Sequence, residues 1–330
     1  MAETLSEHEV IIVGGGPAGA TAAWELVKNG VDCLILDREA FPREKLCAGW
    51  ITPEVVRDLE FVPEDYPYRF LTFDVLNISI KGLKLPFRAP QHSIRRFEFD
   101  RWLVERSGAP VTIHNVRHVV ADENGFIIDD KFRCRYLIGA GGTRCPVYRD
   151  LFRSLQPRAK ELQVVTQELE YPCQYEDGNC YLWFFTDGLP GYGWYVPKAD
   201  GYVNVGVGGV ANKLRRKGDD IKRHWQALID RLIKTGLINV PPGQPGGYSY
   251  FLRAKADITH QGNAYLIGDA TGLATRDMCE GIGPAVQSGL MAARAIHHKT
   301  TFDLAQVDAH TLGPKIVYRA LDYAFTGNRA

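Results

Sequence analysis

Residues 10–23 read VIIVGGGPAGATAA, and this stretch decides the fold. Its first four residues are wholly apolar, which is typical of a short strand buried inside a parallel sheet. An alanine-rich helix is expected over 17–29, where Gly30 ends it, and a second apolar strand over 31–37. Strand, helix and strand in this order predict a βαβ unit and hence an α/β fold.

Three glycines between the first strand and the helix have the spacing G-x-G-x-x-G, and they are Gly14, Gly16 and Gly19. The first permits a tight turn, the second lets a pyrophosphate approach the backbone, and the third lets the helix pack closely on the strand. The helix N-terminus offers free N–H groups to a phosphate. Asp37 ends the second strand, where its carboxylate could accept hydrogen bonds from a ribose. This pattern predicts a dinucleotide site.

FAD and NAD both fit this motif, and a second glycine turn distinguishes them. Gly268 and Asp269 follow the apolar strand AYLI and precede another glycine turn and helix. A carboxylate that returns to the same site from so far along the chain could bind a ribityl hydroxyl, which only a flavin has. The alternative is that Asp269 caps a helix. We therefore expect FAD as the cofactor.

The composition bounds the class of protein. A length of 330 residues predicts two lobes, and Lys plus Arg equal Asp plus Glu at 39 each, so no excess of positive charge indicates a nucleic-acid partner. The acidic N-terminus lacks the features of a signal peptide, and no apolar run is long enough to cross a bilayer. We expect a cytoplasmic enzyme.

The seven cysteines are an odd, scattered set, which indicates thiols in a reducing compartment. Cys173 and Cys180 flank Asp177-Gly178, a hairpin signal that would make a disulfide between neighbouring strands geometrically conceivable, although such bonds are rare in the cytosol. The histidines show no metal-ligand spacing, so we expect no metal site.

The rest of the chain divides between two lobes. Residues 161–211 are rich in β-formers with closely spaced aromatic and glycine residues, as in an antiparallel sheet that encloses something flat or apolar. Helical spacing is present over 95–107, 213–236 and 283–298. We expect a doubly wound, Rossmann-type FAD-binding lobe from residues 1–52, 91–155 and 258–300. A β-rich antiparallel substrate lobe is expected from 53–90 and 156–257, with a C-terminal helical segment over 301–330.

Five segments together resemble the geranylgeranyl reductase family of flavoproteins, which has the p-hydroxybenzoate hydroxylase fold. In chain order they are GGGPAGATAAWEL, FPREKLCAGWI, RRFEFDRWL, GYGWYVPKADGYVNVGVGG and LIGDATGLATRDMCEGIGPAVQSG. The resemblance covers most of residues 8–295. It implies reduction of isolated prenyl double bonds in lipids or in the chlorophyll tail, and the family's relatives include flavin monooxygenases and halogenases.

The resemblance also implies which residues hold FAD and where the substrate lies. The implied cofactor-binding residues are Gly14, Gly16, Gly19, Asp37, Arg38, Lys45, Cys47, Ala48, Arg96, Gly142, Gly268, Asp269, Gly281 and Ile282. The substrate pocket would lie on the face of the isoalloxazine.

An aromatic signature of the family, Y-x-W-x-F-P followed by G-x-G, is present with valine in place of phenylalanine. Its residues are Tyr192, Trp194, Val196, Pro197, Gly206 and Gly208. Aromatic faces with small glycines opposite them form a flat slot for an apolar chain. The alternative is an ordinary aromatic sheet core. With the resemblance, we expect Tyr192 and Trp194 to hold the substrate.

The segment 41–51 corresponds to the family's loop against the flavin, where Cys47 would lie near the isoalloxazine. Its thiol could donate a proton to the carbon opposite the one that receives a hydride, or could shape the pocket as a small polarizable group. Both roles stay open from the sequence. Cys47, Tyr192 and Trp194 are thus the candidate catalytic residues.

The chain departs from the family pattern at two places. Gly141 stands where the family has an aspartate linked to FAD and nicotinamide handling, so NAD(P)H and a ferredoxin-type protein are both candidate electron donors. Arg276 and Cys279 replace the proline and first glycine of P-x-x-G-E-G-I. Arg276 either adds to the stabilisation of negative charge on the flavin by the helix N-terminus at 280–283, or is a solvated loop residue.

Three functions follow from these observations. The first is reduction of carbon–carbon double bonds in an apolar, prenyl- or lipid-like substrate, with peripheral membrane contact through that substrate. The second is a flavin monooxygenase that hydroxylates an aromatic compound or a residue of another protein. The third, a minor alternative, is a non-catalytic FAD-binding or assembly protein, with which the altered flavin loops and the short C-terminal region are compatible.

Overall fold

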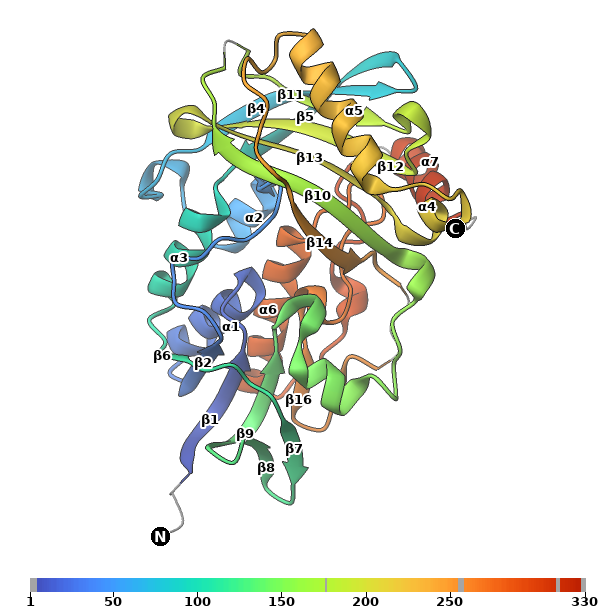
Figure 1. The fold of residues 1–330 in the computed structure, drawn as a ribbon. Coiled ribbons are helices and arrows are strands. Elements are labelled where there is room, and N and C mark those ends of the chain that lie inside the picture. The colour runs from blue at the N-terminus through green and yellow to red at the C-terminus, as the bar shows by residue number, and fades with distance from the viewer. Residues whose placement is uncertain (1–4, 176, 255–257, 313–314, 328–330) are drawn as a thin grey trace.

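The computed structural model describes residues 5–175, 177–254, 258–312 and 315–327. Within them, two sheets of eight strands each form an upper and a lower layer (Figure 1). The helices α1, α2, α3 and α6 lie between the layers, and α5 covers the outer face of the upper sheet (Figure 1). The fold is the predicted α/β arrangement of a parallel sheet and a β-rich second lobe.

The lower sheet contains the predicted βαβ unit, made of β1 (Ser6–Val13), α1 (Pro17–Lys28) and β2 (Cys33–Asp37). The strand β1 pairs in parallel with β2 on one side and with β9 (Phe132–Gly139) on the other. The remaining strands are β6 (Val111–Ile113), β7 (Val119–Asp122), β8 (Gly125–Ile128), β15 (His260–Gln261) and β16 (Ala264–Leu266). Because β16 pairs in parallel with β9, three segments far apart in sequence share this sheet.

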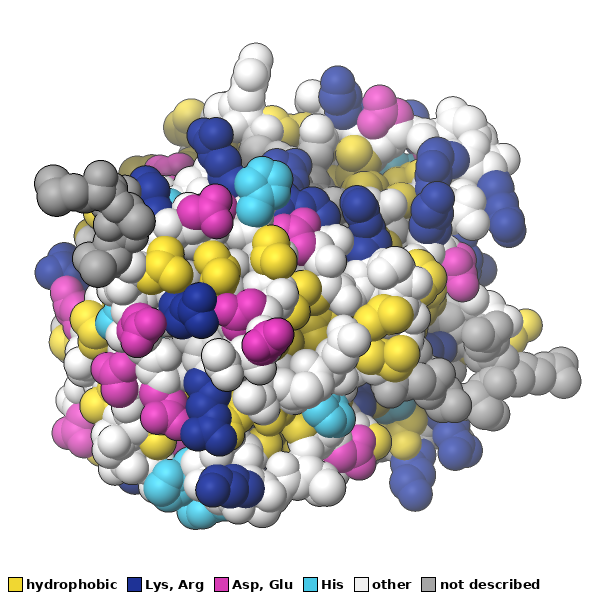
Figure 2. Space-filling model, turned by 90° about the horizontal axis from the view of Figure 1, so that it is seen from below, with side chains coloured by type: hydrophobic (Ala, Val, Ile, Leu, Met, Phe, Trp, Pro, Cys, Tyr) yellow, Lys and Arg dark blue, Asp and Glu magenta, His cyan; other side chains and the backbone are white. Residues whose placement is uncertain are grey.

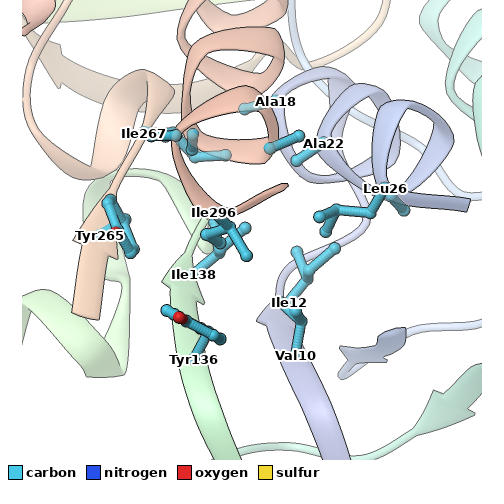
Figure 3. Close-up of a cluster of buried hydrophobic side chains, with 14 of the residues drawn as sticks. Val10, Ile12, Ala18, Ala22, Leu26, Tyr136, Ile138, Tyr265, Ile267 and Ile296 are labelled. Atoms are coloured by element: carbon cyan, nitrogen blue, oxygen red, sulfur yellow. The ribbon is translucent and has the colours of Figure 1, made fainter. Parts of the chain in front are cut away.

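The helices α1 and α6 (Ile282–His298) cross closely above the lower sheet. A Cβ at Gly289 of α6 would lie only 2.5 Å from the Ala18 carbonyl oxygen of α1, so a glycine is needed at the crossing. Side chains of both helices and of β1 and β9 meet there, including Ala18, Ile12, Ile138 and Ile296 (Figure 3). This packing fixes the N-termini of α1 and α6 near each other.

The upper sheet has the strand order β14-β10-β13-β12-β11-β4-β5-β3, in which only β11 and β4 are parallel neighbours. Its strands are β3 (Trp50–Ile51), β4 (Leu71–Ile80), β5 (Leu83–Ser93), β10 (Gln163–Pro172), β11 (Cys180–Phe184), β12 (Gly191–Lys198), β13 (Tyr202–Val210) and β14 (Gly246–Phe251). The amphipathic helix α5 (Ile221–Lys234) packs Trp225, Leu228 and Leu232 on the outer face of this sheet. The inner face is thereby left to the interior of the molecule.

The other helices join or cover these layers. They are α2 (Pro53–Asp58), α3 (Arg96–Ser107), α4 (Ala211–Arg216) and α7 (Lys315–Thr326). Single helical turns lie at η1 (Pro63–Asp65), η2 (Gly142–Arg144), η3 (Tyr148–Phe152), η4 (Lys160–Leu162), η5 (Thr186–Gly188), η6 (Ala199–Gly201), η7 (Gly268–Ala270) and η8 (Leu304–Gln306). None of the helices in the described ranges is both apolar enough and long enough to span a bilayer.

Two local expectations were wrong. The helix predicted over 213–236 is divided into α4 and α5, because Gly218 has a positive φ of 62° and Asp220 caps α5 by accepting from the Lys222 amide. The hairpin expected around 177–178 is absent from the described strands, since β11 pairs with β12 and β4 rather than with β10. Cys173 and Cys180 are accordingly free thiols.

Basic and acidic side chains are intermingled over the centre and left of the face seen from below the lower sheet (Figure 2). This mixture agrees with equal numbers of positive and negative residues in the whole chain. No single charge therefore dominates this face as an electrostatic docking surface would require.

Candidate active site

A cavity of about 600 Å³ lies between the two layers. The glycine turn, the end of β2 and the N-terminus of α6 line its lower part, and β10, β12, β13 and β14 line its upper part. Of the predicted site residues, fourteen line the cavity: Gly14, Gly16, Asp37, Arg38, Lys45, Cys47, Ala48, Arg96, Gly142, Tyr192, Trp194, Asp269, Gly281 and Ile282. Gly19 and Gly268 lie outside its lining.

The three glycines of the fingerprint are needed for different reasons. A Cβ at Gly19 would lie 1.9 Å from the Gly14 carbonyl oxygen, and one at Gly14 would lie 2.5 Å from the Ala140 carbonyl oxygen. Both positions therefore require glycine for packing. A Cβ at Gly16 would have only Arg43 Nη2 near it, at 3.6 Å. The backbone at Gly16 is thus open to the cavity, as the approach of a pyrophosphate to the start of α1 requires.

The carboxylate of Asp37 accepts hydrogen bonds from two backbone amides of the protein. Its Oδ2 accepts a hydrogen bond of 2.7 Å from the Gly15 amide, and its Oδ1 accepts one of 3.1 Å from the Glu39 amide. These bonds tie the glycine turn to the end of β2. A carboxylate offers about four acceptor positions, so lone pairs remain for a ribose hydroxyl.

Asp269 presents a carboxylate to the cavity from η7. No described residue donates a hydrogen bond to that carboxylate, and the N-caps of η7 and α6 are Ile267 and Gly281. The structure therefore does not support the helix-cap alternative. Gly268 has a positive φ of 58°, and a Cβ there would lie 3.0 Å from Ala18 Cβ, so its role is close packing between α1 and α6.

The free carboxylate of Asp269 leads to a first prediction. Burial raises the pKa of Asp269, so the folded apoprotein loses stability as pH rises from the unfolded value near 4 through the raised one. An Asp269→Asn apoprotein should consequently melt higher than the unmodified one at pH 7, with no difference at about pH 3.5, where both unfolded and folded carboxyls are protonated. FAD affinity should fall tenfold or more, because the variant loses roughly the free energy of one charge-assisted hydrogen bond.

Thermal melts of the apoprotein at both pH values and fluorescence titration with FAD check this pair of effects. If the Asp269→Asn protein binds FAD as tightly as the unmodified chain, Asp269 does not bind the cofactor.

The segment Arg43–Trp50, here termed the cysteine loop, is anchored to the upper sheet by Lys198. The Lys198 ammonium is fully buried and donates to the carbonyls of Ala48, Gly49 and Ile94, the last two at 3.2 and 2.8 Å. Burial lowers the pKa of Lys198 to about 8. Asn204 Nδ2 adds a bond of 3.0 Å to the Cys47 carbonyl. The position of the loop thus depends on residues far away in the sequence.

Cys47 lies beside a buried ion pair. Its Sγ accepts from the Gly49 amide at 3.4 Å, and Arg96 lies next to it. Arg96 bonds both oxygens of Asp100, at 2.6 and 2.7 Å, and Arg43 reaches the same carboxylate at 3.3 Å. Although burial opposes its charge, Asp100 and Cys47 raise the pKa of Arg96. The thiol is therefore held at the cavity wall among cationic groups.

Tyr192 and Trp194 form an aromatic wall with their polar atoms already bonded. The Tyr192 hydroxyl donates to the Met278 carbonyl at 2.5 Å, and Trp194 Nε1 donates to Asn204 Oδ1 at 2.7 Å. A Cβ at Gly206 would lie 2.2 Å from the Trp194 ring, so this glycine lets the ring lie flat on β13. The two side chains therefore contribute apolar ring surface to the lining of the cavity.

The C-terminal segment completes this wall. Arg276 bonds Asp322 of α7 through both carboxylate oxygens, at 2.8 and 2.9 Å, and does not line the cavity. The structure supports neither a flavin-stabilising nor a solvated Arg276. From α7, Phe325 reaches the cavity and contacts the Tyr192 ring edge-on, with ring centroids 6.4 Å apart. Arg276 therefore holds the helix that closes the apolar end.

This contact leads to a second prediction. Arg276→Met should cost roughly 2–3 kcal/mol, because Asp322 loses its charge-assisted partner. The segment that includes α7 should become susceptible to limited proteolysis, while an Arg319→Met control on the exposed side of the same helix should not change the cleavage pattern. Equal cleavage of the Arg276 variant and the unmodified chain would show that α7 does not depend on this pair.

Several cavity residues were not among the predicted site residues. They are Arg43, Thr166, Glu168, Tyr248, Tyr250, Glu280 and Phe325. Glu280 accepts from the Gly283 amide at 2.8 Å at the start of α6, and burial raises its pKa to about 7. Arg158 bridges the turns η2 and η7 by donating to the carbonyls of Thr143 and Ala270, at 2.5 and 2.6 Å. From the sequence, Glu280 is expected at a helix N-terminus and Phe325 in the C-terminal helical segment, but neither side chain has an assigned role there.

Comparisons with known proteins identify the cofactor-binding domain and the family. A family model described as an FAD binding domain matches residues 7–62. An uncharacterized protein of Methanosarcina barkeri is 30% identical over 89% of this chain and 75% of its own length. Digeranylgeranylglycerophospholipid reductase 2 of Methanopyrus kandleri is 27% identical over 89% of this chain and 79% of its own. A solved geranylgeranyl bacteriochlorophyll reductase-like protein from Thermoplasma acidophilum has a TM-score of 0.76 at 18% identity, covering 89% and 79% of the two chains.

The residues of the cavity fit the cofactor that these comparisons indicate, which is FAD. The open backbone at Gly16, the helix N-terminus beside it and the unpartnered carboxylate of Asp269 are suited to a pyrophosphate and a ribityl chain respectively. Between the glycine turn and the aromatic wall, one continuous cavity connects these groups.

Proposed function

Because the chain belongs to the geranylgeranyl reductase family of FAD-dependent oxidoreductases, we propose that it reduces carbon–carbon double bonds of an apolar, prenyl- or lipid-like substrate. One observation carries this proposal. The aromatic wall of Tyr192, Trp194 and Phe325 offers ring surface rather than free polar groups, and it faces the same cavity as the flavin-binding turns. Such a surface favours an apolar chain over a polar substrate.

In this proposal each part of the cavity has one task. Gly14, Gly16 and the start of α1 bind the pyrophosphate, and Asp37 and Asp269 bind the ribose and ribityl hydroxyls. Bound FAD supplies the hydride. The N-terminus of α6, at Gly281 and Ile282, stabilises negative charge. The other assigned cofactor contacts are Arg38, Lys45, Cys47, Ala48, Arg96 and Gly142.

The substrate is held against Tyr192 and Trp194, and the closed apolar end excludes water from the reacting carbons. Cys47 lies at the edge of this region and either gives a proton or shapes the slot. The reaction therefore needs a hydride, a proton and an apolar pocket, and the chain's own residues provide the last two.

Finer features extend the same proposal. The electron donor is NAD(P)H or a ferredoxin-type protein, and membrane contact is peripheral, through the lipid-like substrate. A cytoplasmic location is supported by the seven free thiols in the described residues. The FAD-binding lobe comprises residues 1–52, 91–155 and 258–300, which supply all eight described strands of the lower sheet.

The mass of the product tests this function. Purified protein with FAD and dithionite is incubated with geranylgeranyl lipids, and the product should gain two hydrogens per reduced bond. A product that gains one oxygen would assign the chain to the monooxygenases that share the fold. Bound FAD with no turnover of any substrate would favour the non-catalytic alternative.

A further inference from the structure

One buried carboxyl group that lines the cavity, that of Glu168 on β10, has no role in the function proposed above. Its side chain is only 3% exposed. Its Oε2 has no hydrogen-bond partner among the described residues, and its Oε1 receives a long contact of 3.4 Å from Thr166 Oγ1. A buried carboxyl oxygen without a partner is costly, so such a group in a cavity indicates a ligand or a reaction.

Glu168 lies next to the aromatic wall. The position of a Cβ at Gly206 is 2.7 Å from Glu168 Cβ and 2.2 Å from the Trp194 ring, so both side chains come together over this glycine. Electrostatic interaction with Glu168 also reaches Tyr192 and Tyr250, which line the same end of the cavity. The carboxyl group is therefore located where the proposed function holds the reacting double bond.

The charged groups that face Glu168 are already engaged elsewhere. Lys45 donates to the Leu46 carbonyl and lies 3.2 Å from the centroid of the Tyr248 ring, and Lys198 donates to three carbonyls. The groups around the carboxyl are Lys45 on the cysteine loop, Lys198 and Tyr192 on β12, Asn204 on β13, Tyr250 on β14 and Thr166 on β10. Burial raises the pKa of Glu168 to about 7, with Lys45 and Lys198 opposing the rise. A carboxyl group with a pKa raised in this way can hold a proton near neutral pH.

We propose that Glu168 is the acid that protonates the substrate, a role that rests on the proposed function. A hydride from reduced FAD forms one C–H bond as the π bond breaks, and the Glu168 proton forms the second C–H bond on the neighbouring carbon. In total the substrate gains two hydrogen atoms, one as a hydride and one as a proton. FAD is left oxidised, and Glu168 is left as a carboxylate. Water returns the proton, and the electron donor reduces FAD again.

Glu168 and Cys47 then have different roles in the reaction. The Cys47 sulfur accepts a hydrogen bond from the Gly49 amide and lies beside Arg96, whereas Glu168 is part of the cavity lining and its buried Oε2 has no hydrogen-bond partner among the described residues. Cys47 then shapes the slot, and the proton comes from the upper sheet.

The matched variants are Glu168→Gln and Glu170→Gln. Glu170 lies two residues further along the same strand but pairs with Arg95, at 2.8 Å, outside the cavity lining. Glu168→Gln should bind FAD and be reduced by dithionite as the unmodified chain is, while double-bond reduction falls by roughly 100-fold or more. Glu170→Gln should keep its rate. The unmodified rate should fall as pH rises through about 7, and the Glu168→Gln rate should not.

A second readout needs no substrate. In an infrared titration, the C=O band of protonated carboxyls should decrease as pH rises through about 7, and Glu168→Gln should remove one part of that decrease. Glu280→Gln should remove a further part, and Asp269→Asn is the control for the third buried carboxyl whose pKa is raised.

Glu168→Gln that reduces substrate at the unmodified rate and pH dependence, or that leaves the infrared titration unchanged, would overturn this assignment. An unmodified chain that reduces no prenyl substrate, yet shows the Glu168 titration, would instead overturn the proposed function.

Discussion

A Gly16→Val variant should fold almost as stably as the unmodified chain and yet retain no FAD. A side chain at this position meets no backbone, only Arg43 Nη2 at 3.6 Å, so the cost to folding is at most about 1 kcal/mol for a poorer helix cap. The side chain would instead fill the space through which a pyrophosphate reaches the amides at the start of α1. Two lost hydrogen bonds to a charged group correspond to about 3–6 kcal/mol, or at least a 100-fold weaker affinity.

Gly19→Ala is the matched control, because it adds a smaller side chain to the same motif. Its Cβ would lie 1.9 Å from the Gly14 carbonyl oxygen, so this variant should lose roughly 3 kcal/mol of stability or more. Thermal melts of the apoproteins and equilibrium dialysis with FAD separate the two effects. Gly16→Val protein that purifies with bound flavin would contradict the placement of the pyrophosphate.

Lys198→Met should both destabilise the protein and release FAD. Methionine fills a similar volume, but the carbonyls of Ala48, Gly49 and Ile94 lose their shared donor inside the protein. Each unsatisfied carbonyl costs about 1–3 kcal/mol, so we expect a loss of roughly 3–5 kcal/mol, or a melting temperature lower by about 10 °C. The cysteine loop would no longer be fixed at the cavity, and FAD affinity should fall with it.

Lys217→Met provides the comparison, since this exposed lysine donates to a single carbonyl, that of Gly188, at 2.9 Å. It should change the melting temperature and FAD affinity little. Differential scanning fluorimetry with and without FAD measures both quantities. A Lys198→Met protein as stable as the Lys217→Met protein would mean that the cysteine loop is held by other contacts.

The parts of the fold that could be predicted depend on local sequence signals. Val10 to Val13 and the glycines that follow fix a strand, a turn and a helix within a few residues, and the structure has all three. The same holds for α6, which begins at Ile282 where a glycine turn precedes helical spacing. In each case the backbone conformation is determined by neighbours in sequence, whereas the packing of α1 on α6 also depends on Gly289 beside Ala18.

The parts that could not be predicted depend on contacts between distant segments. Lys198 reads as an ordinary strand residue, and only the folded sheet brings it to the carbonyls of the cysteine loop. No pattern in the sequence predicts that Arg276 pairs with Asp322. Glu168 shares its face of β10 with the polar residues Thr166 and Glu170, so its burial follows from the layer packed against that strand. Sequence patterns describe which face a residue takes, but not what covers that face.

The most direct test of FAD-dependent reduction is an anaerobic single-turnover measurement. Protein whose flavin has been reduced with dithionite, and freed of excess reductant, is mixed with a geranylgeranyl lipid while the flavin absorbance is followed. We predict that the absorbance of oxidised FAD returns without oxygen and that one double bond is reduced per flavin. Flavin that stays reduced with the lipid, and is oxidised only when oxygen is admitted, would contradict the account.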